Sequence, residues 1–192
     1  GGALLEMSSK YGCRPEEAAK LMKRVQAAGA APCLTFHVGS QCLSPFSYAQ
    51  AIEIAQRAIT LSGVNIAALD IGGGFPAAYS GQEPPPYHWY FDMIKEALTT
   101  LGRPDLHVMC EPGRALCAPG ISLVTQVVMR RGDRLYLNDG IYGSFDEQRF
   151  ISFDEDYPPS GITLDAKGKA KMLTGEKRPF RRLHRVGGSD MH

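Results

Sequence analysis

The strongest constraint on the fold is a regular alternation of short apolar segments and longer amphipathic ones. Three apolar runs of strand length occupy residues 33–38, 66–71 and 107–111. Their apolar residues fill both faces, which is typical of strands in a parallel sheet with helices packed over it. Because amphipathic segments of helix length separate these runs, the sequence predicts an α/β fold.

Apolar periodicity and residues that favour helix ends predict three helices. The first covers residues 15–29, where the apolar positions follow the i, i+3, i+4, i+7 spacing of one buried face. The second covers residues 44–61, with Ser44-Pro45 as its candidate cap and Gly63 as its stop. The third covers residues 87–101, after a loop rich in glycine and proline.

The strand spacing fits two arrangements of a parallel sheet. The strand ends near His37, Ile71 and Glu111 are 34 and 40 residues apart. A closed (β/α)8 barrel needs about 31 residues per unit, and a doubly wound open sheet spaces its strands similarly. Both arrangements place ligands at the carboxyl ends of the strands.

The helical periodicity stops after Pro119-Gly120. Apolar and β-branched runs at residues 121–129 and 134–137 flank a turn, so they predict an antiparallel segment. We therefore expect two domains, covering residues 1–120 and 121–192.

Composition excludes several classes of protein and favours a soluble, cytoplasmic one. Basic and acidic residues nearly balance, at 21 and 20, so the net charge indicates neither a nucleic-acid nor a membrane partner. No apolar run is long enough to span a bilayer. The five cysteines are irregularly spaced, which argues against a disulfide framework or a metal site. For the basic residues between Lys167 and Arg185, a solvated strand pair or an artificial end is favoured over a nucleic-acid arm.

Three unusual clusters follow the three predicted strands, one at each strand end: HVGSQ at 37–41, DIGGGFP at 70–76 and EPGR at 111–114. Consecutive glycines expose backbone N–H groups and let an anion approach without a Cβ in the way. A lone glycine triplet is more often a tight turn, but the neighbouring clusters add a hydroxyl and a guanidinium. The combination predicts a phosphate site built from these residues: Gly39, Ser40, Gly72, Gly73, Gly74, Gly113 and Arg114.

His37 and Glu111 each have a structural and a functional interpretation. His37 is either a satisfied core histidine or a ring that stacks on a ligand. Glu111 follows an apolar strand, where a carboxylate needs a cationic partner. That partner is either Arg114 or a protonated ring nitrogen. A stacking histidine, a carboxylate and a phosphate site together suit pyridoxal 5′-phosphate (PLP) used as an electron sink.

In their order and spacing these motifs, extended by EPGRALCAPG at 111–120, resemble the alanine-racemase-fold (group IV) PLP-dependent decarboxylases of basic amino acids. The stretch NDGIYGSF at 138–145 resembles the ornithine decarboxylase branch of that family. The resemblance covers roughly residues 4–150. It implies a TIM-type barrel, PLP as cofactor, a homodimer, and L-ornithine converted to putrescine.

The resemblance also implies a role for each matching residue. His37 would stack on the cofactor ring, and Glu111 would keep the pyridine nitrogen protonated. Ser40, Gly73, Gly74, Gly113 and Arg114 would hold the phosphate, with Gly72 part of the same loop. Lys10, in a Lys-aromatic-Gly segment, would line the site without binding the cofactor covalently.

The family's cofactor-binding lysine would lie upstream of these residues, and its later Cys-Asp pair has no match here. The resemblance therefore implies the C-terminal half of a barrel followed by the start of a β-domain, inactive in isolation. Alternatives are a non-catalytic regulatory homologue, a lysine or diaminopimelate decarboxylase, and an alanine-racemase-type isomerase. The isomerase is disfavoured because that enzyme places an arginine where Glu111 stands.

Overall fold

The computed structural model describes residues 3–5, 11–79, 83–131, 134–140, 142–144, 162–164 and 170–172. The chain divides into two compact units. The first contains residues 1–78 and 83–121, and the second contains residues 79–82 and 122–192.

A parallel three-stranded sheet lies at the centre of the first unit. Its strands are β2 (Cys33–Thr35), β4 (Ala68–Asp70) and β5 (His107–Met109), in the order β2-β4-β5. In register, Thr35 pairs with Asp70, which pairs with Met109. Helices α2 (Phe46–Ser62) and α3 (Tyr87–Thr99) connect successive strands. The prediction of an α/β fold with a parallel sheet is confirmed.

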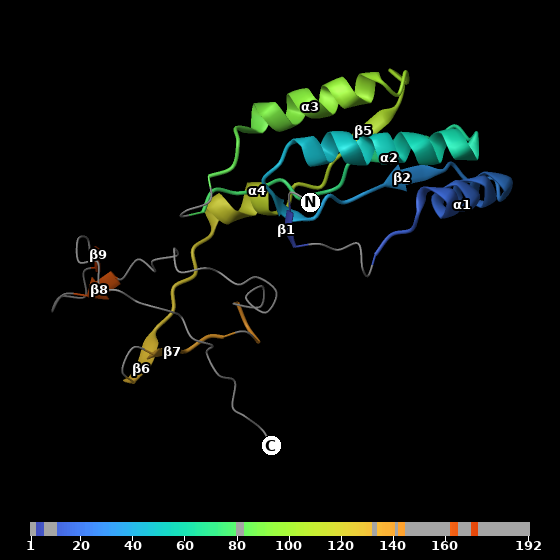
Figure 1. Cartoon of the computed structure of the whole chain (residues 1–192). Helices are drawn as coiled ribbons and strands as arrows, with labels where there is room; N and C mark the ends of the chain where they lie inside the picture. The colour runs from blue at the N-terminus through green and yellow to red at the C-terminus, as the bar shows by residue number, and fades with distance from the viewer. Residues whose placement is uncertain are drawn as a thin grey trace. The chain divides into compact units, whose positions relative to one another are not determined.

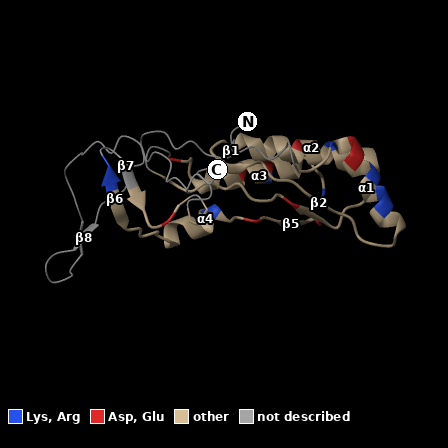
Figure 2. Cartoon of the chain, turned by 90° about the horizontal axis from the view of Figure 1, so that it is seen from below, with Lys and Arg blue, Asp and Glu red and all other residues tan. Residues whose placement is uncertain are grey.

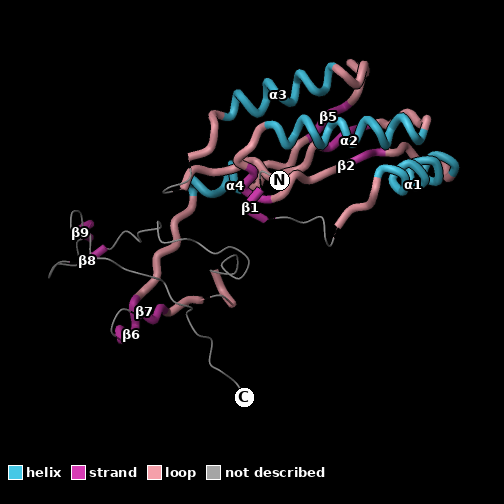
Figure 3. The backbone as a smooth tube through the Cα atoms, viewed as in Figure 1, coloured by secondary structure: helices cyan, strands magenta, loops and turns pink. Residues whose placement is uncertain are grey.

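The helices pack on one face of this sheet. Helix α1 (Pro15–Ala27) packs against α2, and α2 packs against α3, so the three lie side by side (Figures 1 and 3). Leu69 of the central strand is fully buried in the core cluster that the helices cover. Because side chains alternate along a strand, Ala68 and Asp70 face the opposite side of the sheet. The other buried members of the core cluster are Met22, Cys42, Tyr48, Ile52, Ala55, Ala58, Ile66, Ile71, Phe75, Tyr90 and Ile94.

The helix ends agree with the sequence predictions in part. Pro15 stands in the first turn of α1, and Gly63 ends α2 with a left-handed φ of +62°. The prediction that Ser44-Pro45 caps α2 is confirmed at Pro45, and Ser44 lies one residue before the N-cap. Pro45 is the N-cap and has helical backbone angles, so its carbonyl accepts the Tyr48 N–H at 3.2 Å.

Strand β3 (Ser40–Cys42) was not predicted separately from the apolar run before it. Strand β2 ends at Thr35, and the chain then turns to pair antiparallel with β1 (Ala3–Leu5). The pairing aligns Leu5 with Ser40. Because this partner lies far away in the sequence, the local pattern could not reveal the turn.

The first unit ends with α4 (Arg114–Cys117) and a 3-10 turn, Ala118–Gly120. The second unit is antiparallel, as predicted, with β6 (Val127–Arg131) beside β7 (Arg134–Leu137) and β8 (Ile162–Leu164) beside β9 (Ala170–Met172). The predicted strand from residue 121 begins only at Val127, because β7 is too short to pair with residues 121–126.

Two further observations concern charge and hydropathy. Lysine and arginine residues lie along the exposed face of α1 (blue in Figure 2). No helix in the described part of the chain is long and apolar enough to cross a membrane. The basic segment from Lys167 to Arg185 lies outside the described residues, apart from β9.

Candidate functional site

The predicted site residues gather at the carboxyl ends of the parallel strands. His37 and Ser40 follow β2, the glycines follow β4, and Glu111 and Arg114 follow β5. Figure 1 shows α4, β1 and the loops between them at this end of the sheet. We call the following residues the strand-end cluster: His37, Ser40, Gly72, Gly73, Gly74, Glu111, Gly113 and Arg114.

Contacts between distant segments join most of the strand-end cluster. The Arg114 guanidinium donates a hydrogen bond to Ser40 Oγ at 3.1 Å. A Cβ atom added to Gly73 would lie 2.8 Å from the Glu111 carbonyl oxygen and 3.0 Å from His37 Nε2. Glycine is therefore required at position 73, because three strand ends meet around it.

Gly72 and Gly74 are held as closely as Gly73. A Cβ atom on Gly72 would overlap the Phe36 carbonyl oxygen, and one on Gly74 would overlap the Gly39 carbonyl oxygen. Both glycines also have positive φ angles, +66° and +97°. Gly113 is different, because a Cβ there would meet nothing within 4 Å. The structure gives no steric reason for glycine at that position.

The C=O groups and the N–H groups of the glycine triplet differ in their hydrogen-bond partners. The carbonyls of Gly72 and Gly74 accept the backbone N–H groups of Glu111 and Cys42, each at 2.9 Å. The Gly73 carbonyl accepts the Tyr48 hydroxyl at 3.0 Å. Among the described residues, the N–H groups of Gly73 and Gly74 donate to no protein acceptor. The three carbonyls of the triplet thus have donors within the protein, and two of its amides are without a protein acceptor among the described residues.

The third amide of the triplet serves a structural role. Asp70, the last residue of β4, accepts the Gly72 N–H at 2.8 Å. This contact closes a turn immediately after the strand. An anion at the triplet would therefore be held by the next two amides.

His37 is exposed, which contradicts its interpretation as a core histidine. Its Nδ1 atom accepts the Gly39 N–H at 2.9 Å. In the neutral ring the proton is therefore on Nε2, the atom that faces Gly73. The ring is held by the loop that carries Ser40.

Glu111 also lies at an exposed position. Its backbone belongs to the framework of the site, since its N–H and carbonyl oxygen face Gly72 and Gly73. The alternative of an ion pair between Glu111 and Arg114 is not observed. Ion pairs within the described residues join Arg57 to Glu16 and Arg103 to Asp105.

Two buried polar residues that support the site were missed by the sequence analysis. Gln41 is 2% exposed, and its side-chain amide pairs with both backbone groups of Ala77, at 2.7 and 3.1 Å. Tyr48 is fully buried and binds Gly73. Tyr48 could have been found, because a tyrosine on a predicted buried helix face needs a partner for its hydroxyl. Nothing in the local sequence marks Gln41.

The described residues of the motif at 138–145, which are 138–140 and 142–144, are joined by hydrogen bonds in the second unit. The Asp139 carboxylate accepts the backbone N–H groups of Gly140 and Ser144, at 2.7 and 3.2 Å. The Ser144 side chain and the Gly140 backbone, both hydrogen-bonded to this carboxylate, lower the pKa of Asp139. Asn138 Oδ1 accepts the Gln126 N–H at 2.9 Å. Lys10 lies outside the described residues.

The part of the chain that the structure describes contains no metal-binding group and no disulfide bond. No group of three His, Cys, Asp or Glu residues there could hold a metal ion. All five cysteines are free, and only Cys42 among them is buried. The strand-end cluster contains backbone amides, a hydroxyl and a guanidinium, which are donors suited to an anion, together with the imidazole of His37 and the carboxylate of Glu111.

Comparison with known proteins shows what this arrangement resembles. Residues 4–118 match the family model described as "Pyridoxal-dependent decarboxylase, pyridoxal binding domain". The lysine/ornithine decarboxylase of Selenomonas ruminantium is 37% identical over 151 residues, which cover 74% of this chain and 38% of that protein. The ornithine decarboxylase of Panagrellus redivivus is 32% identical over 192 residues, covering 84% of this chain and 42% of that protein.

Solved structures give the same result. The Vibrio vulnificus lysine/ornithine decarboxylase complexed with cadaverine matches with a TM-score of 0.66 and 35% identity, over 85% of this chain and 45% of that one. The chain thus spans about two-fifths of the length of the curated relatives it matches. It belongs to the pyridoxal-dependent decarboxylase family, and its α/β unit is part of the pyridoxal-binding barrel domain of that family.

Proposed function

We propose that this chain provides the cofactor site of a PLP-dependent decarboxylase of basic amino acids, with L-ornithine as substrate and putrescine as product. The observation that carries the proposal is the polarity of the glycine triplet, whose Gly73 and Gly74 amides have no protein acceptor among the described residues. Gly74 packs against Gly39, the residue before Ser40, and Ser40 accepts a hydrogen bond from Arg114. Hydroxyl, guanidinium and backbone amides are the donors that proteins use to bind a phosphate group. The names of the relatives support the substrate class.

The strand-end cluster fits PLP in the type of its hydrogen-bond donors. The close packing around Gly73 and Gly74 fixes their backbone, so their amides would be held in place for a phosphate. Ser40 and Arg114 would hold the remaining phosphate oxygens, and the guanidinium would balance their negative charge. Gly72 would position the loop. Gly113 would contribute as the residue before α4, whose first residue is Arg114.

His37 and Glu111 would act on the ring of the cofactor. PLP supplies an electron sink for the electron pair left on the α-carbon when CO2 departs. Glu111 would stabilise a proton on the pyridine nitrogen through its negative charge. His37, oriented by the Gly39 amide, would present the face of its imidazole to the ring. These are the two residues to which we assign catalytic roles.

We further propose that residues 1–120 form the C-terminal half of the barrel and that residues 121–192 begin a β-domain. The change from a parallel to an antiparallel sheet supports this division. The stretch from Asn138 to Ser144 supports the ornithine decarboxylase branch, because its sequence matches that branch. A homodimer is the assembly that the family resemblance implies.

Release of CO2 tests the proposed activity. We expect the protein, expressed as its gene encodes it and supplied with PLP, to release CO2 from L-ornithine. L-Lysine is the second substrate to test, because the Selenomonas relative is named for both amino acids. L-Arginine and meso-diaminopimelate complete the set. If the protein released CO2 from none of the four amino acids, the result would contradict the proposal and favour a non-catalytic homologue.

Replacement of Glu111 tests its role in the chemical step. The E111Q variant should retain PLP but lose about two orders of magnitude in kcat, because the neutral amide no longer stabilises the ring proton. The kcat should fall more than KM rises. Glu53, exposed on α2, provides the control, and E53Q should match the unsubstituted protein. An unchanged kcat in E111Q would remove Glu111 from this role.

A further inference from the structure

Among the described residues, Tyr48 is the one side chain that holds a carbonyl of the glycine triplet. It belongs to α2, is fully buried, and donates its hydroxyl to the Gly73 carbonyl at 3.0 Å. Its ring stacks on Phe75, with centroids 4.8 Å apart and planes at 24°. Tyr90 meets it edge-on at 6.0 Å. These packing contacts leave the hydroxyl little freedom to move.

The direction of one peptide carbonyl determines the direction of the next amide. In a planar trans peptide, the C=O of one residue and the N–H of the following residue point in opposite directions. The Gly73 carbonyl points into the core toward Tyr48, so the Gly74 N–H points away from the core. The contact therefore sets the orientation of one of the two amides available to a ligand.

The peptide between Gly73 and Gly74 needs a contact that fixes its orientation, because both residues are glycines. Gly74 has a φ of +97°, and glycines have few intrinsic preferences that would fix the peptide between them. A rotation of the Gly73–Gly74 peptide would exchange its N–H for its C=O at the ligand side. A carbonyl there would repel an anion instead of binding it.

The other two carbonyls of the triplet do not depend on side chains. Backbone N–H groups of Glu111 and Cys42 hold the carbonyls of Gly72 and Gly74. Only the Gly73 carbonyl is held by a group that a substitution can remove. We propose that Tyr48 is a positioning residue that aims the Gly74 amide at the phosphate of the cofactor. This inference rests on the phosphate site of the proposed function.

The hydroxyl remains a donor across the pH range of interest. Burial, together with the nearby Cys42 thiol, raises the pKa of Tyr48 well above its ordinary value. Burial likewise raises the pKa of Tyr90 to about 12. Both hydroxyls therefore keep their protons at neutral pH.

Tyr90 offers a matched control. It is also fully buried, and its hydroxyl donates to the Cys42 carbonyl at 3.0 Å. The variants Y48F and Y90F each remove one buried hydroxyl and leave one backbone carbonyl without its donor. Both should lose a similar amount of stability against heat. Only Y48F releases a carbonyl of the triplet.

The experiment measures the binding of inorganic phosphate, PLP and pyridoxal to the unsubstituted protein and to both variants by calorimetry. We expect Y48F to bind phosphate and PLP about tenfold more weakly, as the loss of one aimed donor implies. Its affinity for pyridoxal, which has no phosphate, should not change. Y90F should bind all three within about twofold of the unsubstituted protein.

If Y48F bound phosphate as tightly as the unsubstituted protein, or if Y90F lost as much affinity as Y48F, the role of Tyr48 would be overturned and the phosphate site would remain. Absence of phosphate binding by the unsubstituted protein would instead overturn the phosphate site, and the role of Tyr48 with it. An NMR titration of the unsubstituted protein gives a result that does not depend on any variant folding. The Gly74 amide resonance should move as phosphate saturates, and a resonance that stays in place would overturn the assignment.

Discussion

Gln41 adopts a backbone conformation that side-chain-bearing residues avoid. It is the one non-glycine residue with a positive φ, +53°, in the described part of the chain. The left-handed conformation costs such a residue about 1–2 kcal/mol. Its side-chain amide donates to the Ala77 carbonyl and accepts the Ala77 N–H, and these two hydrogen bonds offset the cost. The pairing ties β3 to the segment that follows the glycine triplet.

This balance predicts an unusual order of stability among variants at position 41. Q41A and Q41G both lose the contacts with Ala77, but only alanine keeps a Cβ in the left-handed conformation. We expect Q41G to be more stable than Q41A by about 1 kcal/mol. The native glutamine should be the most stable of the three. Urea unfolding midpoints measure the order.

Gln50 gives the opposite order and serves as the control. It is exposed in the middle of α2, where glycine is less favourable than alanine by about 1 kcal/mol. Q50G should therefore unfold at lower urea than Q50A. If alanine were also the better residue at position 41, the left-handed backbone there would not carry the cost we assign to it.

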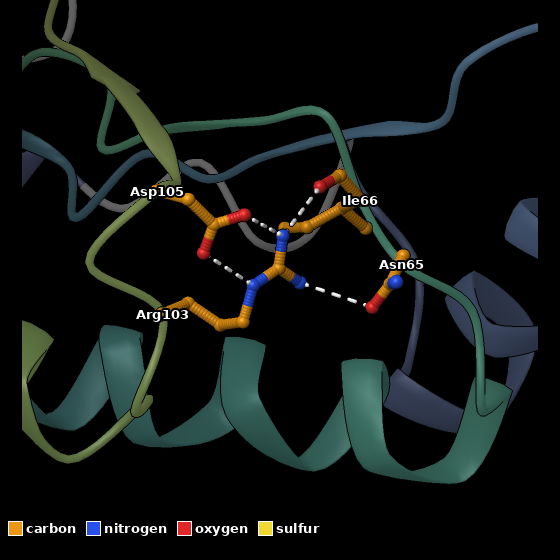
Figure 4. Close-up of polar contacts among 4 residues, drawn as sticks. All are labelled: Asn65, Ile66, Arg103 and Asp105. Atoms are coloured by element: carbon orange, nitrogen blue, oxygen red, sulfur yellow. Dashed lines mark hydrogen bonds and ion pairs between the residues drawn. The ribbon is translucent and has the colours of Figure 1, made fainter.

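At the scale of elements, the loop between α3 and β5 lies at the end of the sheet opposite the site. One of its side chains contacts the segment that leads into the neighbouring strand, β4. Arg103 donates from Nε and Nη2 to the two carboxylate oxygens of Asp105, at 3.0 and 2.9 Å (Figure 4). The same guanidinium reaches Asn65 Oδ1 at 3.2 Å and the Ile66 carbonyl at 3.5 Å. It therefore links the segments that lead into β4 and β5.

The Arg103 and Asp105 contact predicts a pH-dependent contribution to stability. The Arg103 hydrogen bond lowers the pKa of Asp105, so the folded state holds this carboxyl proton less tightly than the unfolded state does. The stabilisation is present above the ordinary carboxyl pKa of about 3.9 and is lost as pH falls through the lowered value. D105N should melt below the unsubstituted protein at pH 7 and show a smaller difference at pH 3.

Asp92 provides the control for this measurement. It is exposed on α3 and takes no part in the ion pairs observed among the described residues. D92N should have the same melting temperature as the unsubstituted protein at both pH values. If the melting temperature of D105N were lower than that of the unsubstituted protein by the same amount at pH 7 and pH 3, packing rather than charge would explain the effect of Asp105.

At the scale of the whole molecule, the first unit exposes strand edges and apolar surface. Among the described strands, β2 and β5 each pair with β4 alone. All three residues of β5 are exposed, including Val108 at 37% and Met109 at 43%. An exposed edge strand with apolar side chains is a template for association.

We therefore expect the 192-residue chain, expressed alone, to self-associate at micromolar concentration. Sedimentation velocity should detect the associated species. M109K places a charge on the exposed edge strand and should shift the distribution toward the monomer. The control, I54K, alters an exposed apolar residue of α2 and should leave the distribution unchanged. A monomeric chain would show that β5 is covered in solution.

The helices α1, α2 and α3 and the three parallel strands of the first unit were predictable because their signals are local. The apolar stripe of α2 and its stop at Gly63 lie within one short segment, so periodicity and turn chemistry identified them. The same holds for the three parallel strands, whose apolar character is continuous. The predicted ends were less accurate, and Ser44 shows why. The geometry of Pro45 decided where α2 begins, and no propensity of the preceding residue could change that.

The sequence by itself determined which residues stand at the three strand ends, because alternating strands and helices bring those ends to one edge of a sheet. Only the tertiary structure decided how these residues meet. Arg114 reaches Ser40 across 74 positions, Gln41 reaches Ala77 across 36, and Tyr48 reaches Gly73 across 25. The direction of the amides in the glycine triplet depends on such distant contacts. Glycine lacks the side chain that would otherwise limit its backbone, so its conformation is set by the residues that pack around it.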